Sequence, residues 1–261
     1  MHPILVEFGF LNLKIFTYGL LVATGFFAGI LLAARWAKQD GLDPQKILDL
    51  CFYIAIASLV GARALYIIVE YRYFLANPLE VLKFWKGGLV FYGGLIGGAL
   101  AFIITTRMRK LDLWQLADIV APGVALGHAL GRLGCFFAGS CYGRPTDVPW
   151  AVTYTNPNSL ARDVLGVPVH PTQLYSAAFL ILLSAILVFI GSRSTFRGQV
   201  IASYGILYGT FRFFIEFFRG DPRGAVTLAD ITLSTSQVVS LLLVPASLGI
   251  YLYLKKRGEE S

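Results

Sequence analysis

The chain has 261 residues, of which 56% are hydrophobic and only 14% are charged, and its mean hydropathy is +0.68. Soluble globular proteins carry about a quarter charged residues, and a soluble chain of this length has no core large enough to bury so much apolar surface. The net charge of +7 comes from basic residues scattered over short segments, which excludes a nucleic-acid-binding patch. Composition therefore indicates an integral membrane protein whose basic loops lie against anionic membrane lipid.

Seven apolar segments are long enough to cross a bilayer, which takes about 20 mostly apolar residues per helix. The first lacks a basic stretch ahead of it and is too long for a cleavable signal peptide. The third is rich in glycine at its start. The predicted architecture is all-α, with about seven transmembrane helices over residues 15–34, 47–70, 88–106, 114–133, 172–191, 199–218 and 234–254.

The one long polar stretch lies between the fourth and fifth segments. Residues 134–171 contain five prolines and two asparagines, which favour turns over regular structure. We interpret this stretch as a small extracytoplasmic cap, or head, inserted into a single membrane domain that covers residues 1–261.

Loop charge predicts the orientation. With the N-terminus outside, the inside connections and the C-terminal tail hold eleven of the 22 basic residues, and the outside connections hold fewer. The positive-inside rule then places the N-terminus outside, the C-terminus in the cytoplasm and the head on the extracytoplasmic side. The eleven are Arg35, Lys38, Lys46, Arg107, Arg109, Lys110, Arg193, Arg197, Lys255, Lys256 and Arg257.

Glycines recur every four residues in two of the predicted spans. Small residues at this spacing let helix backbones approach closely in lipid, which brings neighbouring polar side chains toward one interior. The repeats are Gly123, Gly127 and Gly131 in the fourth span, and Gly93, Gly97, Gly94 and Gly98 in the third.

Three arginines fall within or at the ends of apolar spans: Arg63, Arg132 and Arg212. A charge at the bilayer centre costs at least about 2.5–3.5 kcal/mol, so an intramembrane arginine is a functional-site candidate. The alternative is a side chain that extends to the interface. That alternative suits Arg132, whose span ends there, better than it suits Arg212.

Arg212 belongs to a row of polar residues on the sixth span. Tyr204, Tyr208, Arg212 and Glu216 are four residues apart, so they share one helix face. A structural ion pair between Arg212 and Glu216 is the competing explanation. The two tyrosines, and further arginines beyond the span, favour a binding site instead.

His128 and Arg132 repeat the four-residue spacing in the fourth span. The histidine can be either a packing residue or a member of a site. Arginines on several helices together with tyrosine hydroxyls suit a phosphate, because guanidinium groups donate in pairs to phosphate oxygens. In a membrane the natural phosphate ligand is a phospholipid headgroup.

Cofactor and metal signals are weak. The chain has no phosphate-binding glycine loop, and Cys135 and Cys141 with only His170 are too few for a zinc site. No cofactor and no metal are therefore expected. The two cysteines could form a disulfide across the start of the head, a nucleophilic cysteine is the poorer alternative, and Cys51 is expected to be a buried thiol.

Four motifs together resemble prolipoprotein diacylglyceryl transferases. They are WKGGLVFYGGL at 85–95, GRLGCFFAGSCYGR at 131–144, HPTQLY at 170–175 and RFFIEFFR at 212–219, in the same order as in that family. The resemblance implies seven spans, an outside N-terminus and a periplasmic head in the bacterial cytoplasmic (inner) membrane. It also implies transfer of the diacylglyceryl group of phosphatidylglycerol to the lipobox cysteine thiol of a prolipoprotein, with release of glycerol phosphate, as the first step of lipoprotein maturation.

Site residues follow from the resemblance at matching positions. Arg132 and Arg212 match arginines that hold the lipid headgroup, and we expect both in phospholipid binding and in catalysis. Tyr208 and Glu216 join the catalytic set. The remaining phospholipid-binding candidates are Tyr18, Gly143, His170 and Arg219.

This chain departs from the family pattern at four positions. Cys135 and Ala138 stand where asparagine is usual, Ser140 stands for a glutamate, and Tyr92 stands for a histidine that is a candidate base. Tyr92 is therefore a catalytic candidate, and the base that deprotonates the incoming cysteine is Tyr92, Tyr208 or Glu216. A thiol with a pKa near 8.5 needs only modest activation.

Two other functions remain open from the sequence. One is a divergent transferase that passes a lipid group to a different acceptor, which the altered central motif would explain. The other is a lipid-binding or transport protein without chemistry, although the halves of the chain show no inverted repeat.

Overall fold

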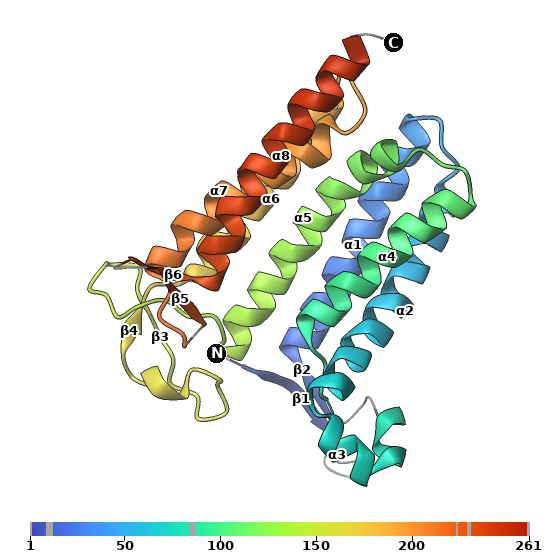
Figure 1. Ribbon diagram of the computed structural model, residues 1–261. Coiled ribbons are helices and arrows are strands. Elements are labelled where there is room, and N and C mark those ends of the chain that lie inside the picture. The colour runs from blue at the N-terminus through green and yellow to red at the C-terminus, as the bar shows by residue number, and fades with distance from the viewer. Residues whose placement is uncertain (1, 9–12, 84–86, 223, 229–230, 260–261) are drawn as a thin grey trace. The chain divides into compact units, whose positions relative to one another are not determined.

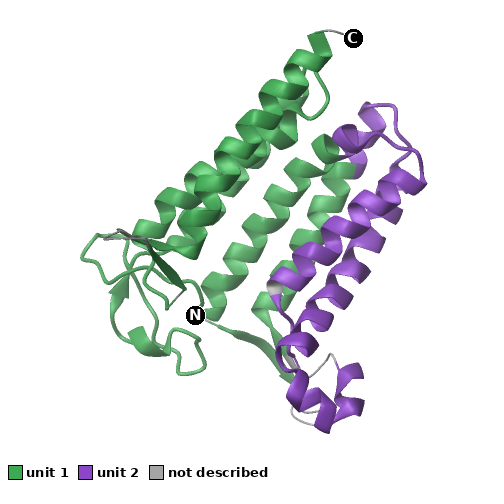
Figure 2. Ribbon diagram, in the orientation of Figure 1, with its two compact units in different colours: residues 1–33, 117–261 green, residues 34–116 purple. Residues whose placement is uncertain are grey.

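The computed structural model describes residues 2–8, 13–83, 87–222, 224–228 and 231–259. Its contacts divide the chain into two compact units (Figure 2). The first unit combines residues 1–33 with 117–261, and the second covers residues 34–116. The single membrane domain expected from the sequence stays a prediction.

Long apolar helices dominate the structure, which confirms the all-α membrane architecture (Figure 1). Six of them are long and apolar enough to cross a bilayer, and a seventh apolar helix, α4, is shorter. All of them lie where the sequence predicts spans, and the exact number of spans stays a prediction. The helices are α1 Thr17–Gln39, α2 Pro44–Val69, α4 Phe91–Met108, α5 Leu113–Ala138, α6 Thr172–Gly191, α7 Gln199–Ile215 and α8 Thr235–Glu259.

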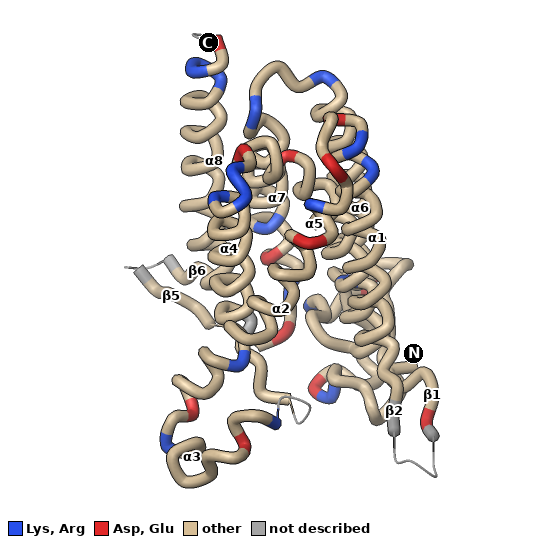
Figure 3. Tube along the Cα trace, turned by 90° about the vertical axis from the view of Figure 1, so that its right-hand side faces the viewer, with Lys and Arg blue, Asp and Glu red and all other residues tan. Residues whose placement is uncertain are grey.

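The outer faces of these helices are apolar. Phe27, Ile68 and Leu242 are 64%, 66% and 70% exposed. A water-soluble protein rarely exposes so many large apolar side chains side by side, whereas lipid solvates them readily. The charged residues of α8 are confined to its C-terminal end, which leaves the rest of that helix uncharged (Figure 3).

Several helix boundaries differ from the sequence expectation, among them the start of α1 and the end of α5. α1 begins at Thr17 because the residues before it form a strand, and α5 continues to Ala138, five residues beyond the expected end at 133. Gly139 has a φ of +78°, and a left-handed glycine commonly ends a helix. The segment between α5 and α6, which we call the head, is therefore residues 139–171, and its place outside the membrane stays a prediction.

Two β-hairpins were not predicted. β1 (Ile4–Phe8) pairs antiparallel with β2 (Leu13–Phe16), and β5 (Ala225–Leu228) pairs antiparallel with β6 (Ile231–Ser234). Each precedes a long helix directly. A hydropathy window does not detect strands this short, and the predicted spans begin only at residues 15 and 234, so most of each hairpin received no assignment.

Glycines bring α1 and α5 together in the first unit. A Cβ added to Gly29 would lie 2.6 Å from the Gly123 carbonyl oxygen, and one added to Gly25 would lie 2.8 Å from that of Gly127. The close approach expected of the glycine repeat is thus confirmed for Gly123 and Gly127. It is wrong for Gly131, which has nothing within 4 Å of its Cβ position, because the contact with α1 continues at Leu130 and Gly134 instead.

The same device joins α2 to α4 in the second unit. A Cβ on Gly61 would collide with the Gly93 carbonyl oxygen, and one on Gly97 would collide with that of Ala57. A short helix α3 (Tyr71–Ala76) and a 3-10 turn η1 (Pro78–Leu82) follow α2.

The head has a small core of its own. Strand β3 (Val152–Thr153) pairs antiparallel with β4 (Pro168–Val169), and the 3-10 turn η3 (Arg162–Val164) lies between them. The buried side chains of this core are Tyr142, Tyr154, Ala161 and Val169, with Val152 and Val164 packed against them.

The N-terminal end of α7 is capped by a carboxylate from α5. Asp118 accepts hydrogen bonds from the backbone N–H groups of Gly198 at 2.7 Å and Ile201 at 2.8 Å. The first N–H groups of a helix have no partner inside it, and a carboxylate there also interacts favourably with the helix dipole. Asp118 thus fixes α7 to α5 at the end remote from Arg212.

Candidate active site

The row expected on α7 forms a continuous polar face. The rings of Tyr204 and Tyr208 stack with centroids 5.6 Å apart and planes inclined by 2°. One turn on, Arg212 donates from Nη1 to Oε2 of Glu216, the first residue of the 3-10 turn η4 (Glu216–Phe218). The side chains of Arg212 and Glu216 are only 13% and 5% exposed, so their charges interact with little screening.

Arg212 also reaches the next helix. Its Nη2 donates to Oγ of Ser236 at the start of α8, at 2.5 Å. The guanidinium is therefore fixed by a carboxylate on one side and a hydroxyl on the other. Ser236 was missed from the sequence, because a serine at a span boundary carries no signal of its own.

On α5, Arg132 is held by His128. Its Nε donates to Nε2 of His128 at 3.1 Å. A ring nitrogen that accepts a hydrogen bond carries no proton, so this imidazole is neutral and is protonated on Nδ1. The His128 ring packs edge-on against Tyr208 with centroids 5.4 Å apart, and the Tyr208 hydroxyl hydrogen-bonds the Arg132 side chain. Arg132 is thus tied to the polar face of α7.

Two thiols lie next to Arg132. Cys135 is near the end of α5, and Cys141 lies close to the start of the head. Their side chains hydrogen-bond each other. All three cysteines of the chain are thiols, so the disulfide considered from the sequence is not formed here. The hydrogen bond from Cys135, together with the charges of Arg219 and Arg132, lowers the pKa of Cys141, although burial opposes this shift.

Tyr18 approaches this group from α1. Its ring and backbone pack against Gly134, where an added Cβ would lie 3.0 Å from the Tyr18 ring. Its hydroxyl interacts electrostatically with Cys135, Cys141 and Arg132. A larger residue at position 134 would therefore displace Tyr18 from the group.

Gly143 lies at the junction between the head and the end of α7. Its N–H donates to the His170 carbonyl oxygen at 3.0 Å, and it bridges Arg219 on the other side. A Cβ on Gly143 would lie 2.5 Å from Cβ of His170 and 2.8 Å from the Phe218 carbonyl oxygen. Only glycine allows the three segments to come this close.

The side chain of His170 faces the aromatic part of this junction. Its Nδ1 is 3.3 Å from the Tyr175 hydroxyl, and its ring packs edge-on against Phe218 with centroids 5.4 Å apart. The Tyr175 hydroxyl also accepts from Nε1 of Trp150 at 2.6 Å. These contacts give His170 a structural role at the junction, and its part in lipid binding stays a prediction.

Arg219 is 5% exposed and forms a bidentate ion pair. Its Nε and Nη2 each donate to an oxygen of Asp221 at 2.9 Å. Burial raises the pKa of Asp221, and the Arg219 charge opposes this shift. Asp221 was missed from the sequence, since the RFFIEFFR motif ends at Arg219 and Asp221 lies two residues beyond it.

Two buried residues of the HPTQLY motif hold the turn that carries Cys141. Thr172 donates from Oγ1 to the Cys141 carbonyl oxygen at 2.8 Å. Gln173 donates from Nε2 to the Ser140 carbonyl oxygen at 2.7 Å and to the Tyr154 hydroxyl at 2.9 Å. The motif therefore fixes the backbone of the turn that positions Cys141, a role that its position in the sequence did not reveal.

Two sequence candidates belong to the second unit. Tyr92 lies in the first turn of α4, and its catalytic role stays a prediction. Arg63 instead donates to backbone carbonyl oxygens of residues 80–88, including Glu80 at 2.5 Å and Gly87 at 2.8 Å. With this set of partners it is a structural arginine, in contrast to the phosphate ligand suggested by its place in a span.

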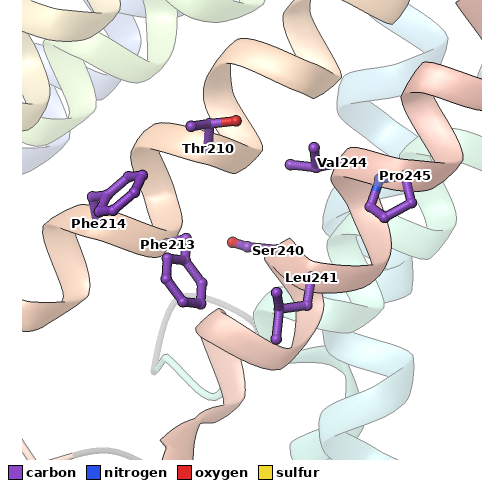
Figure 4. A pocket seen from close by; sticks show the side chains of 7 residues that line it. All are labelled: Thr210, Phe213, Phe214, Ser240, Leu241, Val244 and Pro245. Carbon is purple, nitrogen blue, oxygen red and sulfur yellow. The ribbon is translucent and has the colours of Figure 1, made fainter.

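An apolar groove of about 220 Å³ lies between α7 and α8 (Figure 4). Its lining contains no charged side chain, so it is not the phosphate site. The residues that line it are Thr210, Phe213, Phe214, Ser240, Leu241, Val244 and Pro245.

The chemistry of the first unit is that of an anion site. Arg132, Arg212 and Arg219 form what we call the arginine cluster, with tyrosine hydroxyls beside it. Arg212 and Arg219 have carboxylate partners, whereas Arg132 is hydrogen-bonded by His128 and Tyr208 and forms no ion pair with a carboxylate among the described residues. Within the described part of the chain, no group of three His, Cys, Asp or Glu side chains could hold a metal ion.

The family model for prolipoprotein diacylglyceryl transferase matches residues 3–253. The chain belongs to this family. The chain is 37% identical over 253 residues to the phosphatidylglycerol–prolipoprotein diacylglyceryl transferase of Clostridium tetani, which covers 97% of each protein. It is 35% identical over 269 residues to the transferase of the same name from Geobacter sulfurreducens, with 99% of this chain and 98% of the relative covered. The resemblance drawn from the four motifs is thereby confirmed.

Proposed function

We propose that the protein transfers the diacylglyceryl group of phosphatidylglycerol to the lipobox cysteine thiol of prolipoproteins. A thioether forms and glycerol phosphate is released. The observation that carries this proposal is the family match over nearly the whole chain. The arginine cluster adds the chemistry, because it supplies buried positive charge for a phosphodiester among apolar helices.

The reaction is a substitution at the glyceryl carbon. The acceptor thiolate forms a C–S bond as the C–O bond to the phosphate breaks, and the departing phosphate gains negative charge. Arg132 lies where it can stabilise that charge, since its own partners are neutral. Arg212 adds a second guanidinium whose direction is fixed by Glu216 and Ser236.

The base remains a choice among Tyr92, Tyr208 and Glu216. Glu216 accepts from Arg212 and is nearly inaccessible, which supports a role in orienting the guanidinium. The Tyr208 hydroxyl hydrogen-bonds the Arg132 side chain, so it lies beside the guanidinium that we place on the phosphate, which supports Tyr208 as the proton acceptor. Tyr92 is half exposed on α4, and the peptide-transfer assay described below tests its role.

The protein acts in the bacterial cytoplasmic membrane, with the N-terminus outside and the C-terminus in the cytoplasm. The basic C-terminal end of α8 supports this orientation, because basic segments stay on the cytoplasmic side. The arginine cluster and the head are then extracytoplasmic, where prolipoproteins arrive after export.

The deciding experiment incubates the purified protein in detergent with phosphatidylglycerol and a lipobox peptide. The peptide should gain the mass of one diacylglyceryl group in wild-type protein and none in Arg132→Ala. Arg193→Ala is the matched control. Arg193 lies just beyond the C-terminal end of α6, where its guanidinium packs on the Phe189 ring and is not part of the arginine cluster. Bound lipid without any transfer would favour a different acceptor or a lipid-binding protein without chemistry.

A further inference from the structure

The Cys135–Cys141 pair has no part in the proposed transfer, yet it lies inside the arginine cluster. The two side chains hydrogen-bond each other across the end of α5. Both are half-buried, so they remain accessible to small reagents. Cys141 has a φ of +63°, which is uncommon for a residue with a side chain, and its carbonyl oxygen is held by Thr172. The turn is therefore built to bring this side chain to Cys135.

Charged and polar groups surround Cys141 from several elements. The hydrogen bond from Cys135 lowers the pKa of its thiol, and Arg219 after α7 and Arg132 on α5 lower it further against the effect of burial. Tyr154 and Asp221 also interact with it. A thiolate beside two guanidinium groups compensates part of their positive charge. It thereby competes with a phosphate for the same cations.

We propose that Cys135 and Cys141 are a reversible oxidation site whose disulfide opens the arginine cluster to the phosphate of the lipid. The reduced pair places a thiolate next to Arg132 and Arg219, and the disulfide replaces it by a neutral group. The oxidised protein is therefore the form that binds an anionic headgroup more tightly. The existence of the disulfide is independent of the transfer reaction, and its effect on substrate affinity rests on the proposed function.

The oxidation is a thiol–disulfide exchange with an external disulfide, here oxidised glutathione. The Cys141 thiolate attacks one glutathione sulfur, a mixed disulfide forms and one glutathione thiolate leaves. Cys135 then attacks the Cys141 sulfur, expels the second glutathione and gives up its proton to a leaving thiolate. The two cysteines lose two electrons, and the glutathione disulfide is reduced to two thiols.

Thiol counting tests the disulfide directly. Purified protein is equilibrated in buffers with different ratios of reduced to oxidised glutathione, then denatured and alkylated with N-ethylmaleimide. Mass spectrometry of the intact protein counts the adducts. The reduced protein should carry three adducts and the oxidised protein one, on Cys51. The Cys51→Ala variant should carry two adducts when reduced and none when oxidised, because Cys51, on α2, is not part of the proposed disulfide. Three adducts in every buffer would overturn the proposal.

Lipid binding tests the consequence without any acceptor peptide. A fluorescent phosphatidylglycerol should bind the oxidised protein about tenfold more tightly than the reduced protein, the order expected for removing one nearby charge. Phosphatidylcholine of the same chain length controls for apolar contacts. Cys141→Ser should bind like oxidised wild type in both buffers, since serine carries no charge.

Each result has a separate meaning. A disulfide that leaves lipid affinity unchanged would overturn the link to the arginine cluster. A Cys141→Ser variant that still responds to glutathione would do the same. Loss of peptide modification, with thiol counts and lipid affinity as expected, would count against the proposed transfer alone.

Discussion

Arg132 donates from Nε to Nε2 of His128, one turn earlier on α5, across 3.1 Å. The bond fixes the guanidinium plane and leaves its two terminal nitrogens for other partners. It requires a neutral imidazole, because a protonated ring has no acceptor. His128 is therefore a positioning residue for the cation that we place on the phosphate.

His128→Leu should raise the KM for phosphatidylglycerol about tenfold, because a hydrogen bond to a charged group is worth roughly 1.5 kcal/mol. His128→Gln should restore most of the affinity, since its amide oxygen can accept from Arg132. Lipid titrations in the peptide assay measure both. Equal KM values in the two variants would mean that His128 only fills space.

The charge balance of the cluster predicts an asymmetry between its arginines. Arg132 has no carboxylate partner among the described residues, so Arg132→Ala removes a cation that faces the phosphate and should lower kcat/KM at least about a hundredfold. Arg212→Ala should also abolish transfer, but it leaves the buried Glu216 carboxylate without its cation. That defect typically costs about 3–5 kcal/mol of stability.

The double variant Arg212→Ala with Glu216→Gln separates the two effects. It should recover thermal stability in detergent relative to Arg212→Ala and still fail to transfer lipid. If the single and double variants unfold at the same temperature, the ion pair contributes nothing to stability. Arg132→Ala is the comparison that removes a cation without exposing a buried carboxylate.

Much of this arrangement could be predicted from the sequence. Four-residue spacing is enough to place Tyr208, Arg212 and Glu216 on one face of α7, because helix geometry fixes the angle between them. Spacing says nothing about partners on other helices. Ser236 binds Arg212 only because α8 returns to the end of α7, and no local pattern encodes that return.

The second unit shows the same limit. Arg63 looks like a ligand for phosphate because it interrupts an apolar segment, and nothing local reveals that five carbonyl oxygens of residues 80–88 surround its guanidinium. The hairpin β5–β6 was not predicted for a similar reason, since a hydropathy average over a whole span does not register a short segment with the strand period of 2.

Arg63→Ala should loosen the segment that these carbonyl oxygens belong to. Lysine has a single nitrogen and cannot span the set, so Arg63→Lys should rescue little. Limited proteolysis between residues 76 and 90 measures the effect. Arg72→Ala is the matched control in the same unit, because the Arg72 side chain donates to the exposed hydroxyl of Tyr71. Unchanged cleavage in Arg63→Ala would contradict the anchoring role.

Gly143→Ala should destabilise the junction between the head and the end of α7. The added Cβ would overlap His170 and Phe218, and overpacking of this kind costs about 1–3 kcal/mol. The melting temperature in detergent and the transfer rate should both fall. Gly249→Ala on α8, where nothing lies within 4 Å, should leave both unchanged.

Cys141 should react with iodoacetamide at a pH where ordinary thiols do not. A thiol with a pKa near 8.5 is about 1% ionised at pH 6.5, whereas the hydrogen bond from Cys135 and the charges of Arg219 and Arg132 keep the pKa of Cys141 lower. Since the shift is downward in the folded state, its stabilising effect is fullest above the ordinary thiol pKa and is lost as the pH falls through the folded value. Cys135→Ala removes the largest cause, so the midpoint of the alkylation rate against pH should move upward toward 8.5 in that variant. Peptide mapping assigns the label, with Cys141→Ser as the blank. A wild-type midpoint equal to that of Cys135→Ala would show that the two thiols do not interact.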